Sequence, residues 1–135
     1  MKKLLAILAF VLMYTACSDD TTSFLYVLKN KSSHKVVVKV YYSNYIQSTF
    51  SVEANSYYEQ EYSWDNSFCL IDRYTDSTEI VFDDNKTLTF YRDSLEQKNS
   101  IYNRADYSMV GTDEKLKVFY YTLTDADYTA AKSKK

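Results

Sequence analysis

The sequence predicts an all-β fold: an antiparallel β-sandwich, Ig-like or related, that ends in a short C-terminal helix. Short runs rich in Val, Ile, Tyr and Phe recur along the chain, and Asn, Asp and Ser separate them. The chain has 15 Tyr but one Gly and no Pro, so Asn, Asp and Ser must form the turns. Residues 24–135 have the length of a single domain.

The first half of this domain is expected to hold five strands. The clearest is KVVVKVYY, where alternate β-branched residues define one buried face. In YYEQEYSW, the alternation places Tyr58, Tyr62 and Trp64 on one face of the strand. The five strands are expected at 24–28, 35–42, 48–52, 57–64 and 68–71.

The second half opens with a predicted hairpin. Strands at 78–82 and 87–91 flank the turn sequence DDNK. Residues 92–100 are polar and predict a loop or a helical turn, and 101–109 predicts a weaker strand. The run at 115–123 is apolar on both faces in its second half, which predicts a central, covered strand.

The C-terminus carries helix signals. Thr124 is a suitable N-cap, and Asp125 and Asp127 lie in the first turn, where acidic residues favour a helix. A short helix is therefore expected at 125–131, followed by a frayed basic tail at 133–135.

Residues 1–16 have the pattern of a lipoprotein signal peptide. Lys2 and Lys3 give a positive start, Leu4–Met13 is uncharged and apolar, and small residues precede Cys17. The apolar run is about half of the roughly 20 residues that a membrane-spanning helix needs. A cleaved leader is therefore favoured over a transmembrane anchor.

Cys17 is the expected lipidation site. Tyr14–Cys17 resembles a lipobox, which implies a diacylglycerol thioether on Cys17 and an acylated, for example palmitoylated, amino group. Residues 17–23 would then be a lipidated tether, and the membrane would be a partner through the lipid anchor. The alternative is an ordinary cysteine that happens to follow an apolar run.

The whole mature chain resembles small Bacteroidota lipoproteins that have no assigned activity. The resemblance includes the lipobox, the acidic Ser18-Asp19-Asp20 that follows it, Glu79–Asp84, and Tyr121–Tyr128. It implies an exported β-rich domain, lipid-anchored at the outer membrane. The acidic residues are similar to a surface-export signal, and the alternative is a polar spacer. The resemblance implies no catalytic residue.

Several chemistries lack the residues that they require. The net charge is −2 at pH 7, and a mildly acidic chain without a basic cluster is a poor nucleic-acid binder. His34 is the only imidazole and lies in a predicted turn, while Cys69 lies in an apolar run typical of a buried side chain. Gly111 alone cannot form a phosphate-binding loop. We therefore expect no enzyme, no cofactor and no metal site.

Carboxylates leave two alternatives open. Asp83-Asp84-Asn85 gathers oxygen ligands suited to calcium, but a plain hairpin turn explains these residues better. A glycosidase needs two carboxylates that converge in a cleft. The candidates for such a pair are Asp72, Asp76, Glu79, Glu59 and Glu61.

The surplus of aromatic residues gives the main functional hypothesis. Tyr58, Tyr62 and Trp64 form a strip that could stack on sugar rings or contact a protein. The competing interpretation is that this face is simply core. The sequence thus favours a lipid-anchored, non-enzymatic binding module for a glycan or an envelope protein. The alternatives are a structural or accessory subunit of an outer-membrane assembly that pairs through a sheet edge, and a small hydrolase.

Overall fold

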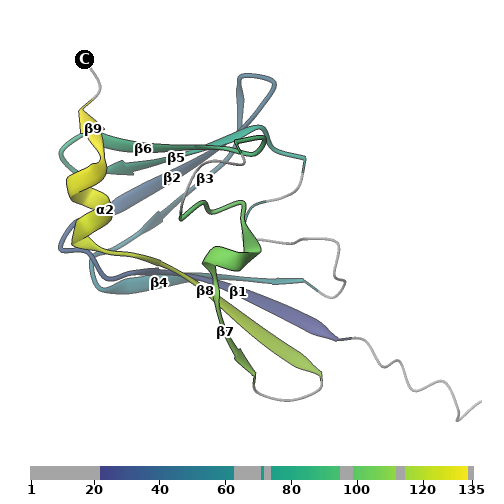
Figure 1. Cartoon of the computed structure of the whole chain (residues 1–135). Helices are drawn as coiled ribbons and strands as arrows, with labels where there is room; N and C mark the ends of the chain where they lie inside the picture. Colours follow the sequence, from purple (N-terminus) through teal and green to yellow (C-terminus); the bar gives the residue numbers. More distant parts are fainter. Residues whose placement is uncertain (1–21, 63–70, 72–73, 95–98, 112–114, 134–135) are drawn as a thin grey trace, which may run out of the picture.

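The protein is a two-sheet β-sandwich with a short helix at one end (Figure 1), which confirms the predicted all-β class. The computed structural model describes residues 22–62, 71, 74–94, 99–111 and 115–133. The predicted signal peptide at 1–16, Cys17, Trp64 and most of the expected strand at 68–71 lie outside these residues.

Sheet A has the strand order β4-β1-β8-β7. The predicted central position of the strand near 115–123 is confirmed, because β8 lies between β1 and β7. The pairing of β1 with β8 is parallel, with Ser23 opposite Leu116, whereas the other described pairs are antiparallel. The strands are β1 (Ser23–Asn30), β4 (Ser56–Tyr62), β7 (Ser108–Gly111) and β8 (Leu116–Leu123).

Sheet B has the strand order β3-β2-β5-β6-β9. The predicted hairpin is confirmed as β5 and β6, joined through the DDNK turn. The tail was wrongly expected to fray from residue 133, since Ser133 pairs with Lys86 on β6. The strands are β2 (Val36–Tyr42), β3 (Tyr45–Val52), β5 (Ser77–Phe82), β6 (Lys86–Tyr91) and β9 (Lys132–Ser133).

Aromatic rings fill much of the space between the sheets. Tyr26 is fully buried and stacks on Phe119, with ring centroids 5.2 Å apart. The edges of Tyr62 and Tyr107 also meet Tyr26, each with a centroid separation of 5.9 Å. From sheet B, alternate residues of β2 and β5, such as Val38, complete the core. The alternation predicted for β2 therefore positions the core as expected.

The strand predicted at 101–109 is wrong over most of its length. Arg104–Asp106 forms a 3₁₀ helix, and β7 begins only at Ser108. Side chains there bond to local backbone groups: Asn103 Oδ1 accepts from the Ala105 N–H at 3.1 Å, and the Tyr107 hydroxyl donates to the Ile101 carbonyl at 2.6 Å. Such local hydrogen bonds compete with a sheet ladder.

Asparagine takes the role that glycine has in most turns. The described residues with positive φ are Ser43, Asn44, Asn55, Asn85 and Asn99, whereas Gly111 has negative φ. Ser43 and Asn44 form a two-residue β2–β3 turn with both φ values positive, as in type I′ turns. The prediction that Asn and Ser form the turns is confirmed.

The helix α2 (Asp125–Ala130) packs at one end of the sandwich. Asp127 Oδ2 accepts hydrogen bonds from the N–H and the hydroxyl of Thr124, which confirms the predicted cap. Tyr128 stacks on His34, with centroids 3.7 Å apart, and Lys86 Nζ lies 3.9 Å from its ring centroid. We call the end of the sandwich that carries α2 the helix end. Figure 1 shows that β1 starts at the opposite end, the N-terminal end.

Candidate binding groove

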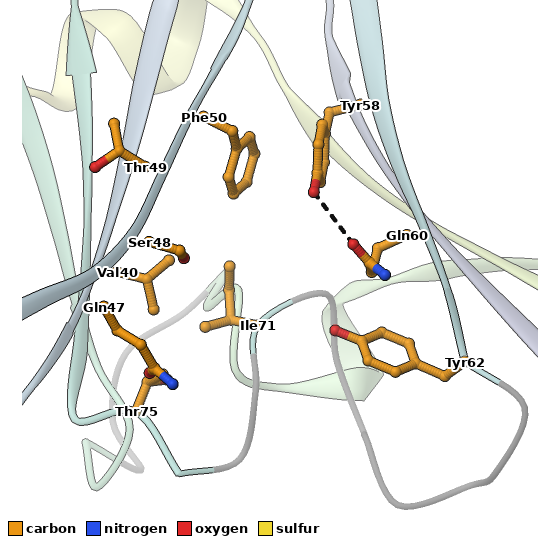
Figure 2. A pocket seen from close by; sticks show the side chains of 10 residues that line it. All are labelled: Val40, Gln47, Ser48, Thr49, Phe50, Tyr58, Gln60, Tyr62, Ile71 and Thr75. Carbon is orange, nitrogen blue, oxygen red and sulfur yellow. Dashed lines mark hydrogen bonds between the residues drawn. The ribbon is translucent and has the colours of Figure 1, made fainter.

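A groove of about 370 Å³ separates β3 from β4 (Figure 2). The two strands are consecutive in the chain but belong to different sheets, and each lies at the edge of its sheet. The groove therefore lies along one side of the sandwich, between the two layers. It is lined by Val40, Gln47, Ser48, Thr49, Phe50, Tyr58, Gln60, Tyr62, Ile71 and Thr75.

A β-bulge shapes the wall that β3 contributes. Val40 pairs with Ser48, but Tyr41 pairs with Ile46, so Gln47 has no residue opposite it on β2. A bulge of this kind bends the strand and redirects side chains. Gln47 and Thr75 both line the groove, and Figure 2 labels them on the side opposite Gln60 and Tyr62.

The wall that β4 contributes carries two of the three predicted aromatic residues. Tyr58, Gln60 and Tyr62 share the inward face and are partly buried, while Tyr57 and Glu59 are exposed on the outer face. The predicted alternation is therefore confirmed for these residues. Trp64, the third predicted aromatic, lies outside the described residues.

Tyr58 and Tyr62 make different contacts within the groove. The Tyr58 ring stacks on Phe50 across the groove, with centroids 4.0 Å apart, and its hydroxyl donates to Gln60 Oε1 at 3.2 Å. Tyr62 packs against the buried Tyr26 in a T-shaped arrangement. The two β4 rings thus combine packing against the core with a position on the groove wall.

The sequence did not identify most of the groove. Phe50, Gln47 and Thr75 come from sheet B or the segment before β5, and no local pattern places them opposite β4. Gln60 was visible only as the polar residue between two tyrosines on the same face. The bulge at Gln47 depends on the pairing of β2 with β3, which the sequence does not specify.

The described lining residues combine aromatic rings, amides and hydroxyl groups, and none of them is charged. An aromatic ring can contact the C–H face of a sugar, while amides and hydroxyl groups both donate and accept hydrogen bonds. In small-ligand sites, polar groups beside apolar surface fix the orientation of the ligand. This chemistry suits an uncharged polar ligand that has apolar faces.

The predicted carboxylates do not converge where the structure describes them. Glu59 and Glu61 lie on the outer face of sheet A, opposite Val27 and Leu25. Glu79 accepts a hydrogen bond from the Tyr41 hydroxyl at 2.9 Å on the outer face of sheet B. Asp76 accepts from the Ser43 N–H, and Asp72 lies outside the described residues.

The acidic residues of the DDNK turn bind the loops and helix around them. His34 Nδ1 lies 2.8 Å from Asp83 Oδ1, and Asp84 Oδ2 accepts from the Tyr128 hydroxyl at 2.7 Å. That Tyr128 hydrogen bond lowers the pKa of Asp84. Across the described residues, no group of three or more His, Cys, Asp or Glu side chains is arranged to hold a metal ion.

Asp125 makes a similar contact at the helix end. Its Oδ1 accepts from the N–H of Ser33 at 2.9 Å and from the Ser33 hydroxyl at 3.1 Å. The N–H bond is the main cause of the lowered pKa of Asp125. The helix end is therefore held by hydrogen bonds that favour ionised carboxylates.

Comparison with protein-family models finds no match for this chain, and comparison with curated proteins finds none either. In the described part of the chain, no helix has the length and apolar character needed to cross a bilayer.

Proposed function

We propose that the protein is a lipid-anchored envelope protein that binds a glycan, without catalysis, in the groove between β3 and β4. The observation that carries this proposal is the combination of Tyr58 and Tyr62 with the amides of Gln47 and Gln60 in one groove. Its volume of about 370 Å³ falls in the range of small-ligand sites. A short saccharide segment offers the ring faces and hydroxyl groups that this lining can contact.

The anchor is the second part of the proposal. Lipid on Cys17 would hold the mature domain at the outer membrane, because each buried methylene contributes about 0.8 kcal/mol and several acyl chains act together. Metabolic labelling with palmitate should mark the native chain. The Cys17→Ser variant should lose the label, and a chain that stays unlabelled in its native form would refute the anchor.

The glycan proposal is tested with the lipidated full chain reconstituted in nanodiscs and screened on a glycan array. Gln60→Ala removes an amide from the groove, and Tyr62→Ala removes a ring from its wall. Each should weaken binding by about tenfold, which corresponds to about 1.4 kcal/mol, a common cost of one lost polar contact.

Tyr57→Ala is the matched control, since Tyr57 lies on the same strand but on the outer face. It should leave glycan affinity unchanged. Equal losses for Tyr57→Ala and Gln60→Ala, or no bound glycan at all, would count against the groove as the site.

One observation favours a second candidate, a structural subunit that recruits a partner strand. β3 has eight residues, YIQSTFSV, with no charge and no proline, and in the described structure it pairs with β2 alone. Natural edge strands usually carry charges or prolines that prevent added pairing. Ser51→Lys, outside the groove lining, should abolish such a partner's co-purification and leave glycan binding intact.

A further inference from the structure

Large apolar side chains are exposed mainly at the N-terminal end of the sandwich. Among the described residues, every large hydrophobic side chain that is substantially exposed lies there, except Tyr57. On sheet B these are Tyr42, Tyr45 and Ile46 around the β2–β3 turn, and Tyr91 at the end of β6. Tyr74 precedes β5 at the same end.

Sheet A exposes apolar residues at this end as well. Met109 and Val110 lie on β7 just before Gly111, and Val110 pairs with Val118 on β8. On the same strand β8, Leu116 pairs with Ser23, the first residue of β1. The exposed residues of both sheets therefore lie at the same end of the sandwich as the start of β1.

The shared groove shows that these sheet ends lie together. Tyr62, which pairs with Phe24 next to Ser23, lines the same groove as Gln47, the neighbour of Ile46. At the helix end, Asn30 Nδ2 donates to the carbonyl of Val52, the last residue of β3. Tyr57, opposite Lys29, lies towards that helix end.

The chain before β1 limits how far this end can be from the membrane. Six Cα–Cα steps separate Cys17 from Ser23, and even a fully extended chain of that length spans only about 20 Å. With lipid on Cys17, the start of β1 stays within that distance of the bilayer surface. The helix end lies a strand length away from the start of β1.

Tyrosine suits a bilayer surface. Its ring is apolar while its hydroxyl group forms hydrogen bonds, and tyrosine is enriched where membrane proteins meet the headgroup region. Ile46, beside Tyr45, adds a side chain that gains free energy from leaving water. A tether this short makes the local concentration of bilayer high, so weak contacts suffice to hold one orientation.

We propose that the N-terminal end of the sandwich rests on the surface of the membrane that holds its anchor, with Tyr42, Tyr45, Ile46 and Tyr91 at headgroup level. This inference rests on the lipid anchor of the proposed function. It fixes the orientation of the domain: the strands stand away from the bilayer, the helix end points outward, and the groove opens sideways between β3 and β4.

The test is hydroxyl-radical footprinting of the lipidated full chain in vesicles of phosphatidylethanolamine and phosphatidylglycerol, read residue by residue by mass spectrometry. Tyr57 is an internal control, since it is 63% exposed and Tyr45 is 78% exposed. A domain free of the membrane would oxidise Tyr45 at least as fast as Tyr57. We expect oxidation of Tyr45, Tyr42 and Tyr91 to be several-fold slower than that of Tyr57.

Two variants and a change in the number of protein molecules per vesicle complete the experiment. A Tyr45→Ser, Ile46→Ser double variant should raise the oxidation of Tyr91, whereas Tyr57→Ser should not. Equal oxidation of Tyr45 and Tyr57 in an acylated chain would overturn this inference and leave the anchor intact. A missing acyl group on the Cys17 peptide would instead refute the anchor. Protection that disappears when the protein is diluted among vesicles would identify a second copy as the occupant and also overturn the inference.

Discussion

A single buried amide connects the helix-end turns of both sheets. Asn30 is almost fully buried at the end of β1, and its Nδ2 donates to the carbonyls of His34, Val52 and Glu53 at 2.7, 3.2 and 3.1 Å. Its Oδ1 accepts from the N–H and the hydroxyl of Ser32. Asn30 therefore joins sheet A to the ends of β2 and β3 with its hydrogen-bonding capacity satisfied.

Replacing this amide should destabilise the whole domain. Asn30→Ala removes the hydrogen bonds that the side-chain amide donates to three carbonyls and the one that it accepts from the buried Ser32 N–H, which should lower the free energy of unfolding by roughly 2–4 kcal/mol. Asn30→Asp keeps the shape but points a carboxylate at three carbonyl oxygens, so its loss should be large at pH 7 and smaller in acid. Urea unfolding at two pH values measures both effects, and Ser51→Ala on an exposed position is the control. An Asn30→Asp variant as stable as wild type at pH 7 would contradict this account.

At the scale of elements, α2 is attached to the sandwich through side chains rather than through a sheet. Tyr128 contributes a stacked contact with His34 and a hydroxyl bond to Asp84, and Asp125 accepts from Ser33. Both carboxylates have pKa values below the usual range for aspartate, because hydrogen bonds favour their ionised forms. We therefore expect α2 to pack less stably against the sandwich in acid.

The sign of this dependence follows from linkage. Folding lowers the pKa of Asp84 and Asp125, so their contribution is complete above the ordinary aspartate pKa of about 4 and is lost as the pH falls through the folded value. Tyr128→Phe keeps the ring but removes the hydroxyl bond to Asp84. The protection factors of the α2 amides, which compare each exchange rate with the intrinsic rate at the same pH, should fall below pH 4 in wild type and show a weaker pH dependence in Tyr128→Phe. Tyr91→Phe, at the other end of the sandwich, should behave like wild type. An identical pH profile for wild type and Tyr128→Phe would be evidence against the Asp84 bond.

Local chemistry decides which elements could be predicted from the sequence. The β-branched run of β2 and the DDNK hairpin are correct because alternation and turn residues act within a few positions. The segment 101–107 fails because Asn103 and Tyr107 bond to nearby backbone groups, which a hydrophobicity pattern does not reveal. The parallel contact of β1 with β8 joins residues about 90 positions apart, as in Ser23 with Leu116, so no local pattern encodes it.

At the scale of the whole molecule, the groove depends on how the two sheets end at one side. Tyr58 and Tyr62 were predictable as partners on one face, because they lie four residues apart along a single strand with Gln60 midway between them. Phe50 and Gln47 were not, since their approach to β4 results from packing sheet B on sheet A. A ligand in this groove would contact the edges of both layers, and its binding free energy would oppose their separation.

Ligand binding should therefore raise the thermal stability of the entire domain. A glycan at 100 times its dissociation constant adds about 2.7 kcal/mol to the free energy of unfolding, which for a domain of this size is a rise in Tm of roughly 5–15 °C. Gln60→Ala should lose about half of this rise at the same glycan concentration, while Tyr57→Ala should retain it. Differential scanning fluorimetry with a glycan from the array measures the shift for all three proteins. If Gln60→Ala keeps the full shift, the ligand contacts a surface other than the space between β3 and β4, because a tenfold weaker complex at that concentration must lose about 1.4 kcal/mol of added stability.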